Sequence, residues 1–265
     1  MRVGVIGCGG RMGRAVLREV LGASDLELAG GIERSGHPDL GQDLGLLAGL
    51  GATGLVAASD LAVLLERSDA LIEFSTPEAS LEHARACADR GRPLVVGTTG
   101  FSAEQDRELS RLAERFPLLV APNMSLGVNL LLVLTEQVAR ALGPDFDVEI
   151  LEMHHRQKID APSGTALALG RAAAEGRGVR LDEAAVRVRD GVTGPRVRGT
   201  IGFATLRGGD VVGDHSVIFA GEGERIVLQH LAADRRIYAR GAVAAARWLV
   251  GRSPGRYGMR DVLGL

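Results

Sequence analysis

Apolar and polar positions along the first 120 residues form two patterns, short β-rich apolar runs and longer amphipathic stretches. The short runs predict strands and the longer stretches predict helices, because side chains recur every two residues on one face of a strand and about every 3.6 residues on one face of a helix. The predicted strands cover residues 3–6, 26–32, 70–74, 94–96 and 118–121, and the predicted helices cover 12–21, 61–67, 78–90 and 102–116. This alternation predicts βαβ units, and therefore a parallel sheet with helices on both faces.

The pattern changes after about residue 125. A long apolar helix is predicted over 126–142, a strand over 147–152 and another helix over 163–175. Strand-like runs separated by glycines follow at 186–189, 200–207, 211–220 and 225–229. They predict a second, α+β domain built on a mostly antiparallel sheet. A last helical pattern covers 237–250, and we expect the segment 236–265 to pack back on the first domain. The expected division is therefore an α/β, Rossmann-like domain over 1–125 and a second domain over 126–235.

A glycine-rich loop joins the first predicted strand to the first predicted helix. Glycines at 7, 10 and 13 have a GxxGxxG spacing within the run Gly7-Cys8-Gly9-Gly10-Arg11-Met12-Gly13. Backbone without Cβ atoms can approach a pyrophosphate closely, and the helix N-terminus offers N–H groups to it. A tight turn without a ligand is the plain alternative. The strand before the loop, the helix after it and Glu33, twenty residues after Gly13, favour a dinucleotide. Glu33 suits ribose hydroxyls and Arg34 suits a 2′-phosphate, so both NADH and NADPH fit.

Two further loops fit the same site. Gly97-Thr98-Thr99-Gly100 follows one predicted strand, and Ala121-Pro122-Asn123-Met124 follows the next. Ligands of parallel sheets bind at the carboxyl ends of the strands, where both loops are expected to lie. Each loop by itself is also consistent with an ordinary turn.

Composition removes several classes of function. The formal net charge of the 265 residues is −2, so no basic surface indicates a nucleic acid or an anionic membrane as partner. The longest apolar runs, such as 130–134, are too short to span a bilayer, and the N-terminus does not resemble a signal peptide. Two cysteines make neither a disulfide framework nor a structural zinc site. We therefore expect a cytoplasmic protein.

The cationic residues are thirty arginines and one lysine, Lys158. A composition bias explains the missing lysines, but a lysine can release a proton whereas an arginine stays protonated. Lys158 lies in the run His154-His155-Arg156-Gln157-Lys158-Ile159-Asp160-Ala161-Pro162-Ser163-Gly164-Thr165-Ala166. Ser163 is a plausible N-cap that leaves the amides of Gly164 and Thr165 for an anion. Proton-carrying side chains beside an anion-binding helix start suit a dicarboxylate substrate that must accept a proton.

Plainer interpretations of this run remain open. Adjacent histidines in a strand point to opposite faces, so one of the pair has a purely packing role in that interpretation. A metal site lacks a third ligand at typical spacing, so no metal is expected. His215 and His230 stand alone in strand-like runs and favour structural roles. A cationic surface loop is the plain alternative for the whole run, and the Asp160 to Thr165 continuation argues against it.

These motifs together resemble the 4-hydroxy-tetrahydrodipicolinate reductase family, historically called dihydrodipicolinate reductase. The resemblance extends over nearly the whole chain, and its most specific part is the run from His154 to Thr165. Besides the runs above it rests on Glu152-Met153, Ile201-Gly202-Phe203-Ala204, Gly213-Asp214-His215 and Met259-Arg260-Asp261-Val262-Leu263.

The resemblance implies reduction of 4-hydroxy-tetrahydrodipicolinate to tetrahydrodipicolinate, with loss of water, in the diaminopimelate and lysine pathway. It implies that His154 is a proton donor or acceptor, that Lys158 is the proton donor, and that His155, Gly164 and Thr165, with the Ser163 cap, hold the substrate carboxylates. The nucleotide would lie on residues 7–12, 33–34, 97–99 and 121–124. Homotetramers that associate through the second domain's sheet are implied as well, and we expect the two domains to close over cofactor and substrate.

Two other functions fit part of the sequence. A related dehydrogenase of another amino or imino acid would use the same glycine loop, but the His154–Thr165 run argues against it. A non-catalytic dinucleotide sensor would keep the loop and have no need of Lys158.

Overall fold

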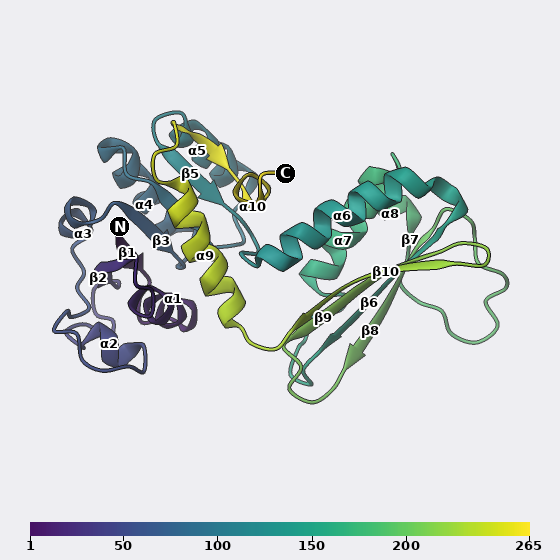
Figure 1. Ribbon diagram of the computed structural model, residues 1–265, viewed down its shortest axis with the longest axis horizontal. Helices are drawn as coiled ribbons and strands as arrows, with labels where there is room; N and C mark the ends of the chain where they lie inside the picture. Colours follow the sequence, from purple (N-terminus) through teal and green to yellow (C-terminus); the bar gives the residue numbers. More distant parts are fainter. The chain divides into compact units, whose positions relative to one another are not determined.

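A computed structural model describes all residues from 1 to 265. The chain divides into two compact units, which Figure 1 shows in sequence colours. Unit 1 comprises Met1–Leu126 and Arg236–Leu265, and unit 2 comprises Gly127–Arg235.

Unit 1 is built on a six-stranded, fully parallel sheet. Its strand order is β11-β5-β4-β3-β1-β2. The strands are β1 (Arg2–Ile6), β2 (Glu27–Ile32), β3 (Ala70–Glu73), β4 (Leu94–Val96), β5 (Pro117–Val120) and β11 (Gly255–Tyr257). Strands β3 and β4 are buried at every position. Such continuous apolar runs are typical of strands covered on both faces. The predicted Rossmann-like architecture is confirmed.

Helices cover both faces of this sheet. They are α1 (Arg11–Leu21), α2 (Leu44–Leu47), α3 (Leu61–Arg67), α4 (Pro77–Arg90), α5 (Ala103–Ala113), α9 (Arg236–Leu249) and α10 (Met259–Leu263). One apolar core joins the sheet to α1 and α9, and a second joins it to α3, α4 and α5. Helix α9 packs beside α1, and its Gly241 lies against the backbone of Met124, where a Cβ would be 1.7 Å from the carbonyl oxygen. The segment from Arg236 onward thus belongs to unit 1, and β11 extends its sheet beside β5.

Local sequence signals determine where several of these helices begin. The side chain of Thr76 accepts a hydrogen bond from the backbone of Ala79, and Pro77 occupies the first helical position of α4. At the start of α5, Ser102 and Gln105 form a capping box. Gly91 ends α4 in the left-handed conformation that glycine adopts readily.

Unit 2 has a five-stranded sheet with helices on one face (Figure 1). The strands are β6 (Asp147–His154), β7 (Ala185–Val186), β8 (Ile201–Arg207), β9 (Gly213–Ala220) and β10 (Arg225–Ala232), in the order β10-β9-β6-β8-β7. The helical segments are α6 (Leu126–Leu142), η1 (Gly143–Asp145), α7 (Gly164–Gly176) and α8 (Leu181–Ala184). Side chains of α6 and α7 pack on Val148, Ile150, Val217 and Phe219 of the sheet.

The sheet of unit 2 is mixed rather than mostly antiparallel. Strand β9 pairs antiparallel with β6 and β10, whereas β8 pairs parallel with β6 and β7. The expectation of a mostly antiparallel sheet is therefore corrected. Strand β6 reaches its parallel neighbour β8 through a crossover that contains α7 and α8, and a parallel pair requires such a long connection.

One helix, over Leu126–Asp145, is long and apolar enough to cross a membrane by length and composition. One third of its apolar window is buried, and Leu131 and Ala139 belong to the core of unit 2. A core helix passes the same test, so a single helix of this kind is weak evidence for a membrane span.

Candidate active site

The glycine loop of unit 1 has the shape of a phosphate cradle. A Cβ at Gly7 would lie 2.2 Å from the carbonyl oxygen of Phe74, and one at Gly13 would lie 1.9 Å from that of Gly7. Only glycine fits at either position, and Gly7 has a φ of +78°. Gly10 is the N-cap of α1 and provides no capping side chain. The first-turn amides of α1 can therefore serve a pyrophosphate, and the loop fits a dinucleotide.

A cavity of about 570 Å³ borders this loop, and its lining includes Gly7, Gly10, Glu33 and Arg34. The Glu33 carboxylate accepts a hydrogen bond from the backbone N–H of Gly9 at 2.8 Å, which ties the end of β2 to the loop. The predicted acidic residue and its cationic neighbour therefore lie beside the predicted phosphate loop.

A second cavity in unit 1, of about 280 Å³, collects residues from three predicted segments. Its lining consists of Met12, Phe74, Gly97, Ala121, Pro122, Asn123, Met124 and Tyr238. A Cβ at Gly97 would lie 2.0 Å from the Phe74 ring, so the close packing of these two residues requires glycine. The loops after β4 and β5 thus meet near the start of α1, as the carboxyl ends of parallel strands predict.

The side chains of some predicted cofactor-binding residues do not face a cavity, so only their backbone could contact a cofactor. Cys8 is fully buried, and burial raises the pKa of its thiol to about 12, with a smaller contribution from Glu33. The Thr98 hydroxyl donates to the buried carboxylate of Glu73, 2.9 Å away. Cys8 and Thr98 therefore have structural side chains, while Arg11 and Thr99 are exposed and line neither cavity.

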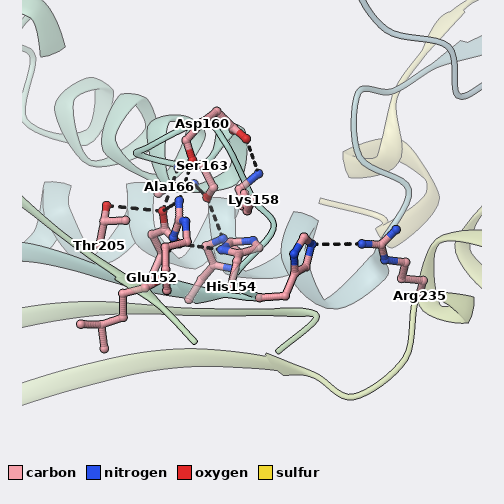
Figure 2. A network of polar contacts seen from close by, with 12 residues as sticks. Glu152, His154, Lys158, Asp160, Ser163, Ala166, Thr205 and Arg235 are labelled. Atoms are coloured by element: carbon pink, nitrogen blue, oxygen red, sulfur yellow. Dashed lines mark hydrogen bonds and ion pairs between the residues drawn. The ribbon is translucent and has the colours of Figure 1, made fainter. Parts of the chain in front are cut away.

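The predicted chemical segment of unit 2 begins at the end of β6. This strand alternates half-buried and buried positions, which places Glu152 and His154 on the same buried face. His154 Nδ1 lies 2.6 Å from Glu152 Oε2, as Figure 2 shows. Because an ionised carboxylate only accepts hydrogen bonds, Nδ1 carries the proton of this bond. Burial lowers the pKa of His154, and the neighbouring Glu152 partly opposes that shift.

Lys158 and His155 each have a partner of their own. Lys158 Nζ donates to Asp160 Oδ1 at 2.8 Å, and the pair lies above His154 in Figure 2. Arg235 Nη2 lies 3.2 Å from His155 Nε2, which accepts because a guanidinium has donors only. Arg235 therefore brings a cationic group beside His155, while the charge of Lys158 is paired with Asp160.

Ser163 is the N-cap of α7, as the sequence predicts. Its hydroxyl oxygen accepts from the backbone N–H of Ala166 at 3.1 Å and lies 3.0 Å from His215 Nε2. Gly164 opens the helix, and a Cβ there would meet no atom within 4 Å. Space for a ligand therefore remains in front of the first turn of α7, where the predicted carboxylate contacts of Gly164 and Thr165 would lie.

Three residues of this cluster were not recognised from sequence. Glu152, with a side chain only 1% exposed, accepts from His154, from Arg207 and from the backbone N–H of Ser163. Arg207 ends β8. His215 packs edge-on against the His154 ring at 5.0 Å, and burial lowers its pKa to about 4. His215 is therefore part of the cluster rather than an isolated structural residue. An acidic residue on the apolar face of β6 was the available signal for Glu152.

Fold and site together define a two-domain, nucleotide-dependent oxidoreductase. Residues 1–124 match the family described as dihydrodipicolinate reductase, N-terminus, and residues 127–263 match its C-terminus. The chain belongs to the dihydrodipicolinate reductase family.

Individual relatives agree with this assignment. The chain is 56% identical over 265 residues to the 4-hydroxy-tetrahydrodipicolinate reductase of Afipia carboxidovorans, covering 100% of this chain and 97% of that protein. It is 54% identical over 262 residues to the same enzyme of Brucella abortus, covering 98% of each. Among solved structures it is similar to dipicolinate-bound dihydrodipicolinate reductase from Paenisporosarcina sp. TG-14. The TM-score is 0.79, the identity is 26%, and the match covers 98% of each chain.

Proposed function

We propose that this chain reduces 4-hydroxy-tetrahydrodipicolinate to tetrahydrodipicolinate, with loss of water, in the diaminopimelate and lysine pathway. The observation that carries the proposal is the cluster in unit 2. A histidine held by a buried carboxylate, a lysine and the start of a helix are gathered at the end of β6. This is the combination that a dicarboxylate needing a proton requires.

The proposed proton transfer involves His154 and Lys158. A nicotinamide bound at the glycine loop would supply a hydride, which C4 of the unsaturated ring left by departure of the 4-hydroxyl would accept. The His154 and Lys158 pair then protonates the neighbouring carbon. Cationic charge on this pair also stabilises the negative charge that develops on the ring.

The proposed substrate contacts use the cationic region and the helix start. His155, with Arg235 beside it, faces one carboxylate, and the backbone of Gly164 and Thr165 at the Ser163-capped end of α7 holds another. The open space at Gly164 supports this role, because a carboxylate must approach the helix amides closely.

We propose that NADH and NADPH both serve as reductant. The cavity beside the glycine loop offers Glu33 for ribose hydroxyls and Arg34 for a 2′-phosphate. The Gly9 contact preorganises the Glu33 carboxylate beside the loop. We propose a cytoplasmic location. Reduced nicotinamide cofactors are present there, and the reducing conditions suit the two free cysteines.

The open face of the unit 2 sheet supports a homotetramer. Helices cover the other face, whereas Leu206, Val227 and Leu231 are 48%, 54% and 61% exposed. Apolar residues gathered on one sheet face indicate a protein interface. We therefore propose that copies of this chain associate through these strands.

A coupled assay tests the proposed activity. The purified protein receives enzymatically generated 4-hydroxy-tetrahydrodipicolinate, and loss of absorbance from NADH and from NADPH is followed in separate reactions. We expect substrate-dependent oxidation of both cofactors. Cofactor binding without turnover would favour a sensor, and turnover only with another imino acid would favour a different dehydrogenase.

A further inference from the structure

The Glu152 carboxylate is the centre of a network that reaches both proposed proton carriers. Its Oε2 contacts His154 Nδ1 at 2.6 Å and Arg207 Nη1 at 2.8 Å. Its Oε1 accepts from Arg207 Nη2 and from the backbone N–H of Ser163, both at 3.0 Å. A buried carboxylate with this many donors is held in one orientation.

Arg207 extends the network to the loop that carries Lys158. Arg207 donates to Glu152 from both Nη1 and Nη2, and its Nη2 also donates to the backbone carbonyl of Asp160 at 2.6 Å. The side chain of Asp160 in turn accepts from Lys158. Residue 207 lies opposite His154 in the parallel pairing of β6 and β8. One guanidinium therefore connects the strand bearing His154 to the loop bearing Lys158.

The geometry around His154 leaves its other ring nitrogen for chemistry. With the proton on Nδ1, Nε2 keeps its lone pair, so His154 in this form must accept a proton at Nε2 before it can deliver one. Gly213 lies directly against it, since a Cβ there would be 3.0 Å from Nε2. Four groups surround the ring: Glu152 on β6, Arg207 on β8, His215 on β9, and Lys158 on the loop after β6. Among these four groups Glu152 is the anion, and it opposes the lowering of the His154 pKa by Lys158 and Arg207.

We propose that Glu152 and Arg207 are positioning residues: Glu152 fixes His154 as the Nδ1–H tautomer, and Arg207 holds Glu152 and the Lys158 loop in register. The proposal rests on the proposed function, in which His154 and Lys158 handle the proton. Neither positioning residue needs to touch the substrate. Together they keep Nε2 of His154 unprotonated and hold the ring in one orientation for proton transfer.

The Glu152→Gln variant tests this role, and the same strand offers a matched control. Glu149 also lies on β6 and accepts from two nitrogens of Arg189, both at 2.8 Å, and from Arg196 Nε at 3.0 Å, but it lies on the opposite face from His154. Glu149→Gln thus removes the same charge from the same kind of pair. We expect E152Q to lower kcat by about 10²-fold with a much smaller change in KM, and E149Q to leave both near wild-type values.

The tautomer itself is read without substrate. In ¹⁵N-histidine-labelled protein at pH 7.5, we expect His154 to have its proton on Nδ1 in the wild type and in E149Q. E152Q should show a mixture of tautomers. This readout tests the positioning role of Glu152 independently of the proposed reductase function. Wild-type protein that fails to turn over the substrate would contradict the proposed function, and the His154 tautomer would still test the role of Glu152.

A second variant covers the case in which E152Q folds poorly. Removing one partner leaves Arg207 as an unpaired, largely buried cation, which destabilises the fold, whereas the double variant E152Q/R207M removes both charges. We expect the double variant to recover thermal stability and to keep the low kcat. Recovery of kcat together with stability, or an unchanged His154 tautomer in E152Q, would overturn the proposal.

Discussion

Replacing Lys158 with methionine should affect stability, by removing an ion pair, and activity, by removing a general acid. The structure indicates which of these two losses is larger. The ion pair from Lys158 to Asp160 spans 2.8 Å, and the two side chains are 20% and 57% exposed. A pair this open to water contributes about 0–1 kcal/mol, so the variant should lose at most a few degrees of Tm. Loss of a general acid should lower kcat by about 10²-fold or more, equivalent to about 2.7 kcal/mol in the barrier. The loss of activity should therefore far exceed the loss of stability.

Two companion variants identify which property of Lys158 matters. Asp160→Asn breaks the same ion pair and leaves the amine, so its kcat should fall much less than that of K158M. Lys158→Arg keeps the positive charge but cannot release a proton near neutral pH, so it should be as impaired as K158M. Cofactor oxidation with saturating substrate gives kcat, and thermal unfolding gives Tm. Near-normal turnover in K158M would refute the reasoning, and recovery in K158R would reduce the role of Lys158 to its charge.

Three further predictions concern the cofactor, acid stability and assembly. Gly10→Ala should weaken NADPH binding, measured by calorimetry, by about tenfold, because the added methyl group would lie at the phosphate-binding loop. Gly258→Ala is the control, since a Cβ there meets nothing within 4 Å, and it should bind NADPH like the wild type. Equal affinities of the two variants would argue against phosphate binding at Gly10. His215 has a folded pKa of about 4 against 6.5, so the folded state resists its protonation and stability should fall as the pH drops from 6.5 towards 4, by up to about 3 kcal/mol. Urea unfolding at several pH values should show a shallower fall in H215Q, and an unchanged slope would contradict this. Leu231→Glu should reduce the oligomer measured by light scattering, whereas Val192→Glu, on a fully exposed loop, should leave it intact.

The elements of unit 1 could be predicted because their signals are local. The predicted helix over 61–67 matches α3, and the predicted strand over 94–96 matches β4. The other predicted ends agree with the structure or differ by one residue, except at α5, which the capping box starts at Ala103 and which ends three residues before the predicted end. The short helices α2, α8 and α10 gave no periodic pattern, because four or five residues do not complete two helical turns, and the strand β11 has only three residues.

Strand partners and buried polar contacts are the features that sequence did not provide. The parallel pairing of β6 with β8 is decided by the path of the α7–α8 crossover, which no residue of either strand specifies alone. Likewise the cluster around His154 draws on two other strands and a helix cap. Arg207 and the backbone of Ser163 donate to Glu152, and His215 packs against the His154 ring, although all three are distant from His154 in sequence or separated from it by a loop. The histidines and the lysine were visible from their types, whereas the groups that orient them were visible only in three dimensions.

Two buried carboxylates illustrate how the fold assigns polar groups to support rather than to reaction. Glu73 ends β3 and accepts from the hydroxyls of Ser75, Ser80 and Thr98, so it ties together the loops after β3 and β4 that border the cofactor cavities. Glu152 lies near the end of β6, and its partners are instead a guanidinium and an imidazole. Neutral donors suffice where a carboxylate only has to hold loops. Glu152 lies beside the ring that we propose exchanges a proton, and hydrogen bonds from Arg207 and His154 keep the pKa of Glu152 low against the opposing effect of burial. The difference in partners, rather than in burial, therefore distinguishes the carboxylate that holds loops from the one that we propose supports the chemistry.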